Sequence, residues 1–272
     1  MAITNFIPTV WSENLYKELD KQYVAVANCN RDYEGDIKNA GSVVKICGVG
    51  SITINNYSKN IDMSNPQALS DTVRDLTINQ AKYFNFQIDD IDKAQASPKL
   101  MDAAMSVAAS ALADMADKYV YSLHEAAGST VDATAADENN IIDSIIEARQ
   151  KLYENNVSDA SGIVIEVSPA VASLILKAKV ALSSDNAETL ETGCLGSIGG
   201  CKVFVSNNIA VQDNVHKCII RTKRAIAFAE QLSEIVAYRP EKRFADALKG
   251  LHLYGASVVY PSEMVLLNVT VA

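Results

Sequence analysis

The clearest pattern along the chain is a run of hydrophobic positions three and four residues apart between residues 98 and 126. That spacing places the apolar side chains on one face of an α-helix. Ser97 is a favoured N-cap residue, and Pro98 is tolerated at the first helical position because its missing N–H would have no partner there. The sequence therefore predicts a long helix from Pro98 to about Ala126, ended by Gly128. Seven alanines between positions 103 and 116 leave one face of it thin.

Two stretches of alternating hydrophobic and polar residues predict strands on either side of a polar segment. The first begins at Val43 and runs loosely to Ile54, and the second covers Tyr83 to Ile88. The polar segment between them, from Asn55 to Asp71, is long for a loop inside a compact domain. Because an isolated two-stranded ribbon is marginal in water, we expect a long two-stranded projection that packs against a neighbour.

The middle of the chain alternates between helix and strand signals. Asp137 or a neighbouring residue is expected to cap a helix that carries five aliphatic residues up to Leu152, and residues 163–167 read as a strand. Ser168 and Pro169 repeat the cap and first-turn device and start a helix to about Lys179. A glycine-rich turn over residues 193–200 is expected to be a flexible loop before a strand at 202–206. Further strands are expected at 218–221, 225–228 and 234–238.

The two ends of the chain differ in pattern. Residues 1–40 are polar and poorly periodic but keep apolar side chains at Phe6, Trp11, Leu15 and Leu19, which is typical of an arm that packs on a partner surface. From Phe244 to Val271, Gly250, Gly255 and Pro261 are expected to separate short apolar strands. These elements together indicate an α+β fold with one long helix.

Composition narrows the class of protein. The chain has 272 residues, of which 49% are hydrophobic and 21% charged, a balance ordinary for a folded domain. The net charge of −9 argues against a protein whose main function is to bind nucleic acid tightly, although it does not exclude a shell that encloses nucleic acid. No apolar run reaches the ~18 residues of a membrane span. The five cysteines form no CxxC pair, which is typical of reduced thiols in a cytosolic compartment.

The sequence gives only weak evidence for a catalytic, metal-binding or phosphate-binding site. The three histidines (His124, His216 and His252) share no metal-ligand spacing, and a structural role is the simpler interpretation. Cys194 and Cys201 could lie close together but lack a second ligand pair for zinc. The glycine-rich turn precedes a strand rather than a helix, so it fails as a phosphate cradle. Asp89, Asp90 and Asp92 could bind a cation or supply an acid and a base, with a solvated strand end as the simpler interpretation. The basic run Arg221, Lys223, Arg224 is too short for a nucleic-acid patch. We therefore predict no catalytic, cofactor or metal residues.

Three blocks of the sequence resemble the major capsid proteins of tailed bacteriophages. They are residues 30–41 (NRDYEGDIKNAG), residues 78–90 (INQAKYFNFQIDD) and residues 237–256 (AYRPEKRFADALKGLHLYGA). The blocks are spread over the chain, and the order of the expected elements agrees with the family throughout.

The resemblance implies the capsid fold first described for phage Hong Kong 97. Carried over by position, the N-terminal arm covers residues 1–40 and the E-loop hairpin 41–78. The P-domain covers 79–136, with its spine helix at 98–127. The A-domain covers 137–233, and returning P-domain strands cover 234–272.

The family role implies a subunit that forms pentamers and hexamers and closes into an icosahedral shell around double-stranded DNA, without sequence-specific binding. It implies a place in the virion capsid, with assembly in the host bacterial cytoplasm. We expect no cofactor and no enzymatic activity. The expected partners are further copies of the chain, a separate scaffolding protein, a portal and a decoration protein. Some relatives begin with a helical extension that a protease removes; here the folded pattern starts within the first residues, so we expect no such cleavage.

The inter-subunit contacts expected on this basis lie in three regions. They are Phe6 and Trp11 in the arm, Lys59 and Asp62 in the hairpin, and Arg239 and Arg243 near the C-terminal block. Some relatives join a hairpin lysine to an asparagine of a neighbour, but nothing around Lys59 and Asn60 supplies the required environment. Two other interpretations stay open: an encapsulin-type shell with enzyme cargo, and a cytosolic enzyme that uses the cluster of Asp89, Asp90 and Asp92.

Overall fold

The structure is a computed structural model of the chain. It describes residues 22–33, 43–49, 71–89, 100–137, 139–157, 162–178, 194–232, 235–242 and 244–271. It also describes residues 15, 18 and 19, and residues 53–56, 59, 62 and 65–68 in the segment between the first two strands. No helix in these parts of the chain is long and apolar enough to cross a membrane.

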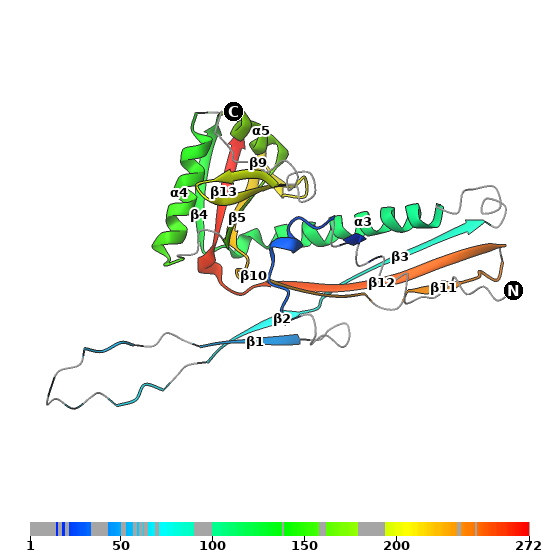
Figure 1. Cartoon of the computed structure of the whole chain (residues 1–272), viewed down its shortest axis with the longest axis horizontal. Helices are drawn as coiled ribbons and strands as arrows, with labels where there is room; N and C mark the ends of the chain where they lie inside the picture. Colours follow the sequence, from blue (N-terminus) through cyan, green and yellow to red (C-terminus); the bar gives the residue numbers. More distant parts are fainter. Residues whose placement is uncertain are drawn as a thin grey trace.

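Two structural units and a projecting hairpin make up the molecule (Figure 1). We call the elongated part the long unit. It contains α3 (Leu100–Ser122), β3 (Gln80–Asp89), β10 (Ile226–Leu232), β11 (Val236–Tyr238) and β12 (Ala245–Val258). The other part, the compact unit, contains a seven-stranded sheet with α4 (Ile141–Glu154) and α5 (Pro169–Lys177). The projecting hairpin is formed by β1 (Val43–Val49) and β2 (Asp71–Thr77) with the residues between them.

The predicted long helix is confirmed within the described residues. After α3 the chain continues as a 3-10 turn, η3 (Leu123–Ala126), while Ser97 and Pro98 lie outside the described residues. The buried positions of α3 recur at helical spacing and face the sheet of the long unit: Met105, Ala109, Leu112, Ala113, Ala116 and Val120. Leu15, Leu19 and Tyr23 join this cluster, so these apolar residues of the expected arm pack on their own subunit.

One central strand, β12, organises the long unit. It pairs antiparallel with β3 along one edge and with β10 and β11 along the other. The expectation that Gly250 and Gly255 separate short strands is therefore wrong, because both lie inside one strand of 14 residues. A Cβ on Gly250 would lie 2.6 Å from the ring of Phe84, and one on Gly255 would lie 2.2 Å from the Thr77 carbonyl oxygen. The two glycines allow other groups to approach closely.

The projecting hairpin also differs from the prediction. The partner of β1 is β2, from Val43 opposite Thr77 to Val49 opposite Asp71, whereas the strand predicted at Tyr83–Ile88 is part of β3 and pairs with β12. Sequence reasoning passed over β2 because, among its described side chains (residues 73–77), only Leu76 is buried. Val44, Ile46, Leu76 and Ile78 form a small cluster with Ala227, Ala229, Leu253 and Val259 at the base of the hairpin.

The compact unit has the sheet order β4-β13-β9-β5-β7-β6, with β8 (Val211–Gln212) beside β9. Its strands are β4 (Ser129–Ala136), β5 (Ile163–Val167), β6 (Cys194–Ile198), β7 (Cys201–Val205), β9 (Val215–Thr222) and β13 (Met264–Val271). Helices α4 and α5 pack on one face of this sheet over an aliphatic core. Residues 129–136 and 264–271 pack in the core of this unit, whereas the sequence analysis grouped them with the P-domain. The expected boundaries at 136/137 and 234 therefore do not follow the two cores.

The predicted helix starts of the compact unit are confirmed, but the glycine-rich loop is not. The Ser168 hydroxyl oxygen accepts a hydrogen bond from the Val171 N–H, and Pro169 stands in the first turn of α5. Helix α4 begins directly after Asn140, three residues beyond Asp137, and the Asn140 side chain makes no capping hydrogen bond. Residues 194–205 form a hairpin in which Gly199 and Gly200 have φ values of 57° and 86°. Two successive positive φ angles suit a two-residue hairpin turn, which explains the glycines.

Substitution of Gly255 tests the close approach between β12 and the end of β2. Gly255→Ala places a methyl group against the Thr77 carbonyl, so we expect it to lower the free energy of unfolding by about 1–3 kcal/mol. Ser257→Ala, two residues along the same strand, is the matched control and should have little effect. Urea unfolding of dispersed subunits measures both. Equal stability of the two variants would contradict the close approach.

Candidate functional site

The described residues include several exposed surfaces that could contact another molecule. No group of three or more His, Cys, Asp or Glu side chains in the described part of the chain could hold a metal ion. His252 is fully buried with Nε2 2.9 Å from Glu230 Oε2, and buried His124 places Nδ1 3.0 Å from the Tyr121 carbonyl oxygen. Asp89 is the last residue of β3, while Asp90 and Asp92 lie outside the described residues. Both buried histidines thus have structural partners.

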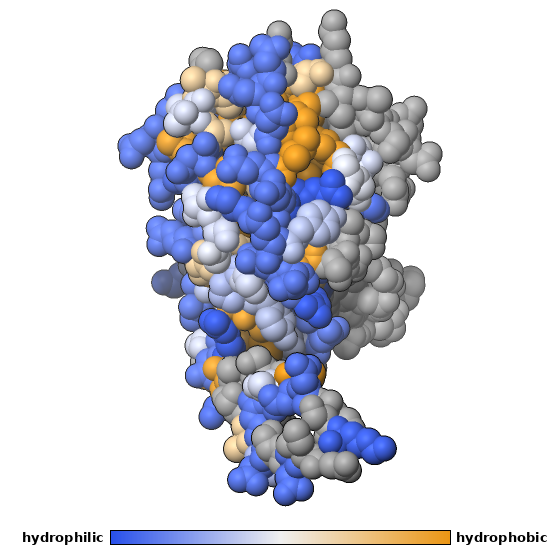
Figure 2. All heavy atoms as spheres, turned by 90° about the vertical axis from the view of Figure 1, so that its left-hand side faces the viewer, coloured by the Kyte–Doolittle hydropathy of each residue, from blue (hydrophilic) through white to orange (hydrophobic). Residues whose placement is uncertain are grey.

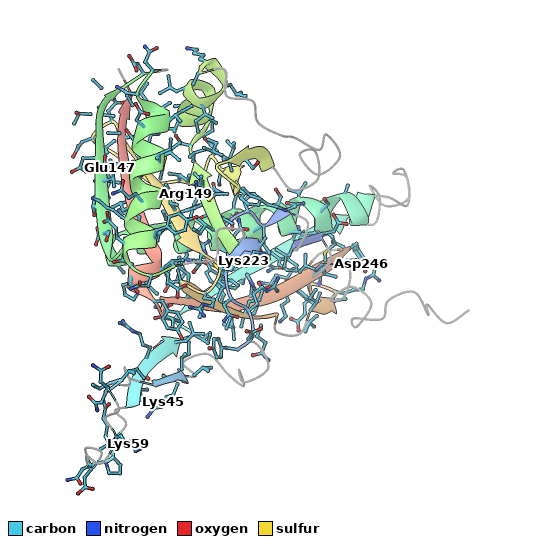
Figure 3. All side chains as sticks on the ribbon, turned by 60° about the vertical axis from the view of Figure 1, so that its left-hand side comes forward. Lys45, Lys59, Glu147, Arg149, Lys223 and Asp246 are labelled. Atoms are coloured by element: carbon cyan, nitrogen blue, oxygen red, sulfur yellow. The ribbon has the colours of Figure 1, made fainter. Side chains whose placement is uncertain are left out.

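The projecting hairpin carries two of the predicted contact residues away from the rest of the subunit. Lys59 and Asp62 are exposed, and Figure 3 shows Lys59 far along the projection beyond Lys45. The Thr53 N–H donates to Gln67 Oε1 at 2.8 Å, which ties the two sides of the projection together. Ile54 nearby is 88% exposed. An apolar side chain at this place has little to pack on in its own subunit.

A second surface is the face of the long unit's sheet that points away from α3. Side chains alternate across a strand, so Phe84 and Phe86 of β3 pack toward the core while Tyr83, 78% exposed, points outward. Tyr238 donates its hydroxyl hydrogen to Asn85 Oδ1 at 3.1 Å, and the Lys249 ammonium lies 5.2 Å from the Tyr238 ring centroid. These contacts give the face a fixed arrangement of aromatic and polar groups.

The end of the long unit farthest from the compact unit is a third surface. Arg239 Nε lies 3.1 Å from Asp246 Oδ1, so the predicted contact residue Arg239 is partly engaged within its own subunit. Figure 3 shows Asp246 at this distal end. Phe244 beside it is 84% exposed. Arg243, like Phe6 and Trp11, lies outside the described residues. Sequence reasoning singled out the arginines but missed the exposed phenylalanine between Arg243 and the strand.

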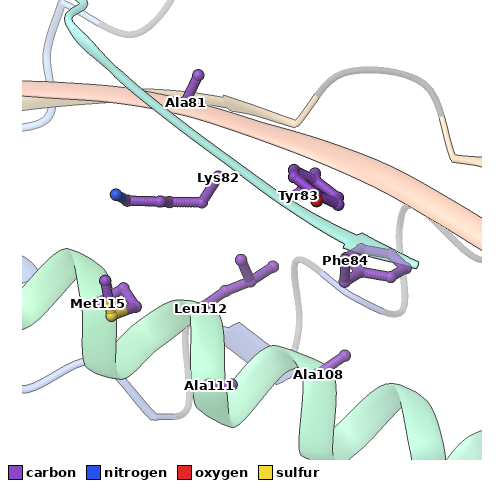
Figure 4. Close-up of a pocket in the computed structure, with 8 residues that line it drawn as sticks. All are labelled: Ala81, Lys82, Tyr83, Phe84, Ala108, Ala111, Leu112 and Met115. Atoms are coloured by element: carbon purple, nitrogen blue, oxygen red, sulfur yellow. The ribbon is translucent and has the colours of Figure 1, made fainter. Parts of the chain in front are cut away.

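An apolar groove of about 300 Å³ lies between α3 and β3 (Figure 4). Phe84 of β3 forms one wall, and Leu112, Met115 and two alanines of α3 form the other. Lys82 also lines the groove and supplies a positive charge. The thin alanine face of the helix, visible in the sequence, is what leaves this space. The sequence could not show that β3 would be its other wall.

The face from which the hairpin projects is mostly hydrophilic. Figure 2 looks at the molecule from that side and shows small, separate hydrophobic patches among polar residues. Exposed apolar side chains of the compact unit include Ile146 on α4 and Leu176 on α5. Small separate patches suit contacts that are individually weak.

The two units meet at a buried polar cluster that the sequence did not reveal. Arg221 on β9 is fully buried and donates from Nε and one terminal nitrogen to the two carboxylate oxygens of Glu166 on β5, each at 3.0 Å. It also donates to the carbonyl oxygens of Ala25 and Asn28, at 3.0 and 2.6 Å. Burial alone would lower the pKa of Arg221, but the Glu166 carboxylate raises it above its ordinary value. Arg221 thus holds residues 25–28 on the junction.

Two further carboxylates hold the same segment, residues 22–31, which we call the arm root. Asp117 on α3 accepts backbone N–H donors from Val24, Ala25 and Val26 at 2.9–3.1 Å. Burial raises the pKa of Asp117 to about 7, although these three donors act in the opposite direction. Glu230 on β10 accepts from the Tyr23 hydroxyl at 2.5 Å and pairs with Arg31 at 2.7 Å.

The three segments where the main chain crosses between the two units are hydrogen-bonded to one another at this junction. The chain passes from one unit to the other near residues 127, 224 and 261. The Gly128 N–H donates to the Pro261 carbonyl at 2.9 Å, and the Val259 N–H donates to the Ala225 carbonyl at 2.8 Å. The Glu263 carboxylate accepts from Thr222 and pairs with Arg224. Two members of the basic run over residues 221–224, Arg221 and Arg224, therefore take part in the junction.

Solved structures similar to this chain include those of phages and phage capsids. A structure titled Mycobacterium phage Che8 is 30% identical, with a TM-score of 0.72, over 92% of this chain and 93% of that chain. The capsid of Cyanophage P-SCSP1u is 12% identical, with a TM-score of 0.67, over 87% and 85%. The mature capsid of bacteriophage PhiM1 is 14% identical, with a TM-score of 0.66, over 91% and 87%. No protein-family model matches, and a search of curated proteins gives no match.

Removal of one partner of the buried ion pair should be costly. Arg221→Met leaves the Glu166 carboxylate buried without its partner, and we expect a loss of about 3–5 kcal/mol in the free energy of unfolding. The double variant Arg221→Met with Glu166→Met should lose less than the sum of the two single variants. Chemical unfolding of all three gives the coupling energy. Strict additivity would show that the two side chains do not interact.

The raised pKa of Asp117 predicts a pH dependence of stability. The unfolded carboxyl titrates near pH 4 and the folded one near 7, so the folded state binds the extra proton between these values. The contribution of Asp117 to stability is therefore fully present below pH 4 and is lost as the pH rises toward 7. Relative to Asp117→Asn, the wild-type protein should lose up to roughly 4 kcal/mol over this range. A difference between the two proteins that does not change with pH would contradict the raised value.

Proposed function

The chain belongs to the major capsid proteins of tailed phages, and from this premise we propose that it assembles as pentamers and hexamers into an icosahedral shell around double-stranded DNA. It is a major capsid subunit with the mixed α and β fold of phage Hong Kong 97. The observation that carries this conclusion is the 30% identity to the Che8 structure over nine-tenths of both chains.

The distribution of buried and exposed groups supports assembly through extended elements. Closed shells form when heterologous contacts repeat with rotations that close. The junction holds the two units together, while the hairpin and the distal end of the long unit carry exposed apolar residues such as Ile54 and Phe244. Each contact is small, and a shell sums many of them.

In this proposal the hairpin of one subunit packs on the outward sheet face of the next. Lys59 and Asp62 stand on the projection, and Tyr83, Tyr238 and Lys249 stand on the receiving face. The distal end with Arg239, Arg243 and Phe244 contacts further copies. We assign the arm to residues 1–40 and the E-loop to 41–78. The P-domain then matches the long unit and the A-domain matches the compact unit, which includes residues 129–136 and 264–271.

Further partners follow from the same proposal. A separate scaffolding protein would direct curvature, a portal would occupy one vertex, and a decoration protein would bind the outside. The net charge of −9 suits a wall that does not adhere tightly to packaged DNA. We propose a structural role without enzymatic activity, in the virion after assembly in the host cytoplasm.

The two alternative interpretations predict different results. An encapsulin-type shell would enclose proteins in place of DNA, so the cargo of purified shells distinguishes it. An enzyme that uses the cluster at residues 89–92 would turn over a substrate as dispersed subunits and lose that activity in Asp90→Asn. The relative with 30% identity is titled as a phage, which favours the capsid interpretation.

Shortening the hairpin tests the proposed function. Wild-type subunits, expressed with their neighbouring genes, should form closed polyhedral shells in negative-stain electron microscopy. Deletion of residues 55–68 keeps the buried base at Val44, Ile46, Leu76 and Ile78, so the subunit should still fold but fail to close shells. Circular dichroism and thermal unfolding check the fold.

A variant with residues 55–68 replaced by a Gly/Ser linker of equal length is the matched control for chain length. It should fail as the deletion does, because flexibility alone supplies no contact. Normal shells from either variant would refute the hairpin assignment. Monomers from the wild-type chain under every condition would refute the proposed function.

A further inference from the structure

The projecting hairpin has no strand pairing with the rest of the subunit among the described residues. Strands β1 and β2 pair with each other as a separate two-stranded sheet (Figure 1), while β3, which follows β2 in the chain, pairs with β12. Only Ile78 and Asn79 lie between the end of β2 and the start of β3. The direction of the hairpin therefore depends on this two-residue link and on side-chain contacts at the base.

The apolar contacts at the base hold the hairpin without fixing its direction closely. Ile78 and Leu76 are buried in the small cluster that the hairpin shares with β10 and β12. Hydrophobic contact is non-directional, so a cluster of this kind lets one element rock on another at little cost. A fixed direction needs a contact whose strength depends on angle.

A hydrogen bond at the link supplies such a contact. Tyr119 on α3 donates its hydroxyl hydrogen to Asn79 Oδ1 at 3.0 Å, and the Gln80 side-chain amide donates to the same oxygen at 3.3 Å. Hydrogen bonds weaken steeply when the donor leaves its preferred direction. The bond from Tyr119 therefore favours one orientation of the link between β2 and β3.

The Tyr119 donor is itself held in place by the core of the long unit. Its ring meets the ring of Tyr254 on β12 edge to face, with the ring centroids 5.7 Å apart. Tyr254 is buried and stacks on Phe228 of β10, with the ring centroids 6.0 Å apart. Aromatic pairs have preferred geometries as well as buried area. The Tyr119 hydroxyl is thus a fixed point from which the link is held.

We infer that Tyr119 is a positioning residue that sets the direction of the hairpin through Asn79, so that the projection meets the correct site on a neighbouring subunit. The inference rests on the proposed assembly. The seven residues of β2 alone span about 23 Å at ~3.3 Å per residue, so a rotation of ~10° at the base moves the far end of this strand by ~4 Å. Side chains stay in contact only within about 4.5 Å, so a shift of this size separates them.

Distance measurements on dispersed subunits test the contact directly. Spin labels at Val73 in β2 and at Ser110 on α3, both exposed, report the direction of the hairpin relative to the helix. They are attached through an introduced keto amino acid, which leaves the five native cysteines unlabelled. We expect one narrow distance distribution in the otherwise wild-type chain. Tyr119→Phe keeps the ring against Tyr254 but removes the hydroxyl, so the narrow distribution should be lost.

Variants of Asn79 and a matched control separate this hydrogen bond from a general loss of structure. Asn79→Asp keeps an acceptor oxygen and should keep the narrow distribution, while Asn79→Leu has no acceptor and should lose it. The double variant with Tyr119→Phe should be no broader than either single variant, because both changes remove the same bond. Tyr153→Phe removes a tyrosine hydroxyl that accepts from Arg149 on α4, and it should leave the distribution unchanged.

Shell assembly gives the second readout. In negative-stain electron microscopy, Tyr119→Phe and Asn79→Leu should give fewer closed shells and a wider range of diameters than the wild type. Asn79→Asp and Tyr153→Phe should assemble as the wild type does. Thermal unfolding of Tyr119→Phe should stay close to that of Tyr153→Phe, since each variant loses one exposed hydrogen bond.

The outcomes separate this inference from the proposed function. A narrow distribution that survives both Tyr119→Phe and Asn79→Leu would overturn the inference, and so would a broad one in the wild type. Normal shells from variants whose distribution has broadened would also overturn it. Failure of wild-type subunits to form any shell would refute the proposed function, whereas the distances in dispersed subunits would still decide whether Tyr119 sets the direction of the hairpin.

Discussion

The fold depends on three buried carboxylates that hold one short backbone segment at the junction of the two units. Glu166 comes from the compact unit, while Asp117 and Glu230 come from the long unit. Burial of a charge costs several kcal/mol unless hydrogen bonds and opposite charges replace the lost water. Here the arm root supplies backbone N–H groups and carbonyls together with Arg31. Asp117 and Glu230 of the long unit accept hydrogen bonds from the arm root, and Arg221 of the compact unit donates to arm-root carbonyls, so the arm root links the two units and favours cooperative folding of the whole subunit.

This arrangement fixes what the subunit offers to its neighbours. The interior of the junction is fully engaged, so contact groups are found on parts that extend from it: the hairpin, the outward sheet face and the distal end with Phe244. Extended elements spread the contacts over several neighbours, which keeps each contact small. Small contacts can break and form again during assembly, and that lets a wrongly placed subunit leave before a shell closes.

Local patterns were enough to predict much of the fold. Helical spacing located α3, and the Ser168–Pro169 signal located the start of α5, because both depend on neighbouring residues alone. Pairing was not predictable in the same way. The strand β2 is polar over most of its length, and among its described side chains (residues 73–77) only Leu76 is buried, where it meets residues far away in sequence. Gly250 and Gly255 looked like breaks because the Phe84 ring and the Thr77 carbonyl they accommodate belong to other strands.

The contact residues were partly predictable and the junction was not. Lys59 and Asp62 follow from their place in a long polar segment, which must project if it is not to be buried. Arg221 lies in a basic run, and such runs are usually exposed, yet Arg221 is fully buried. Successive side chains of its strand point to opposite faces of the sheet, and the side chain of Arg221 lies on the face that meets the arm root. The charge of Arg221 is compensated by Glu166, 55 positions away, and by carbonyls almost two hundred positions away. Partners so far apart in the sequence form no motif with a recognisable spacing. A buried charge pair of this kind is found only when the fold brings its partners together.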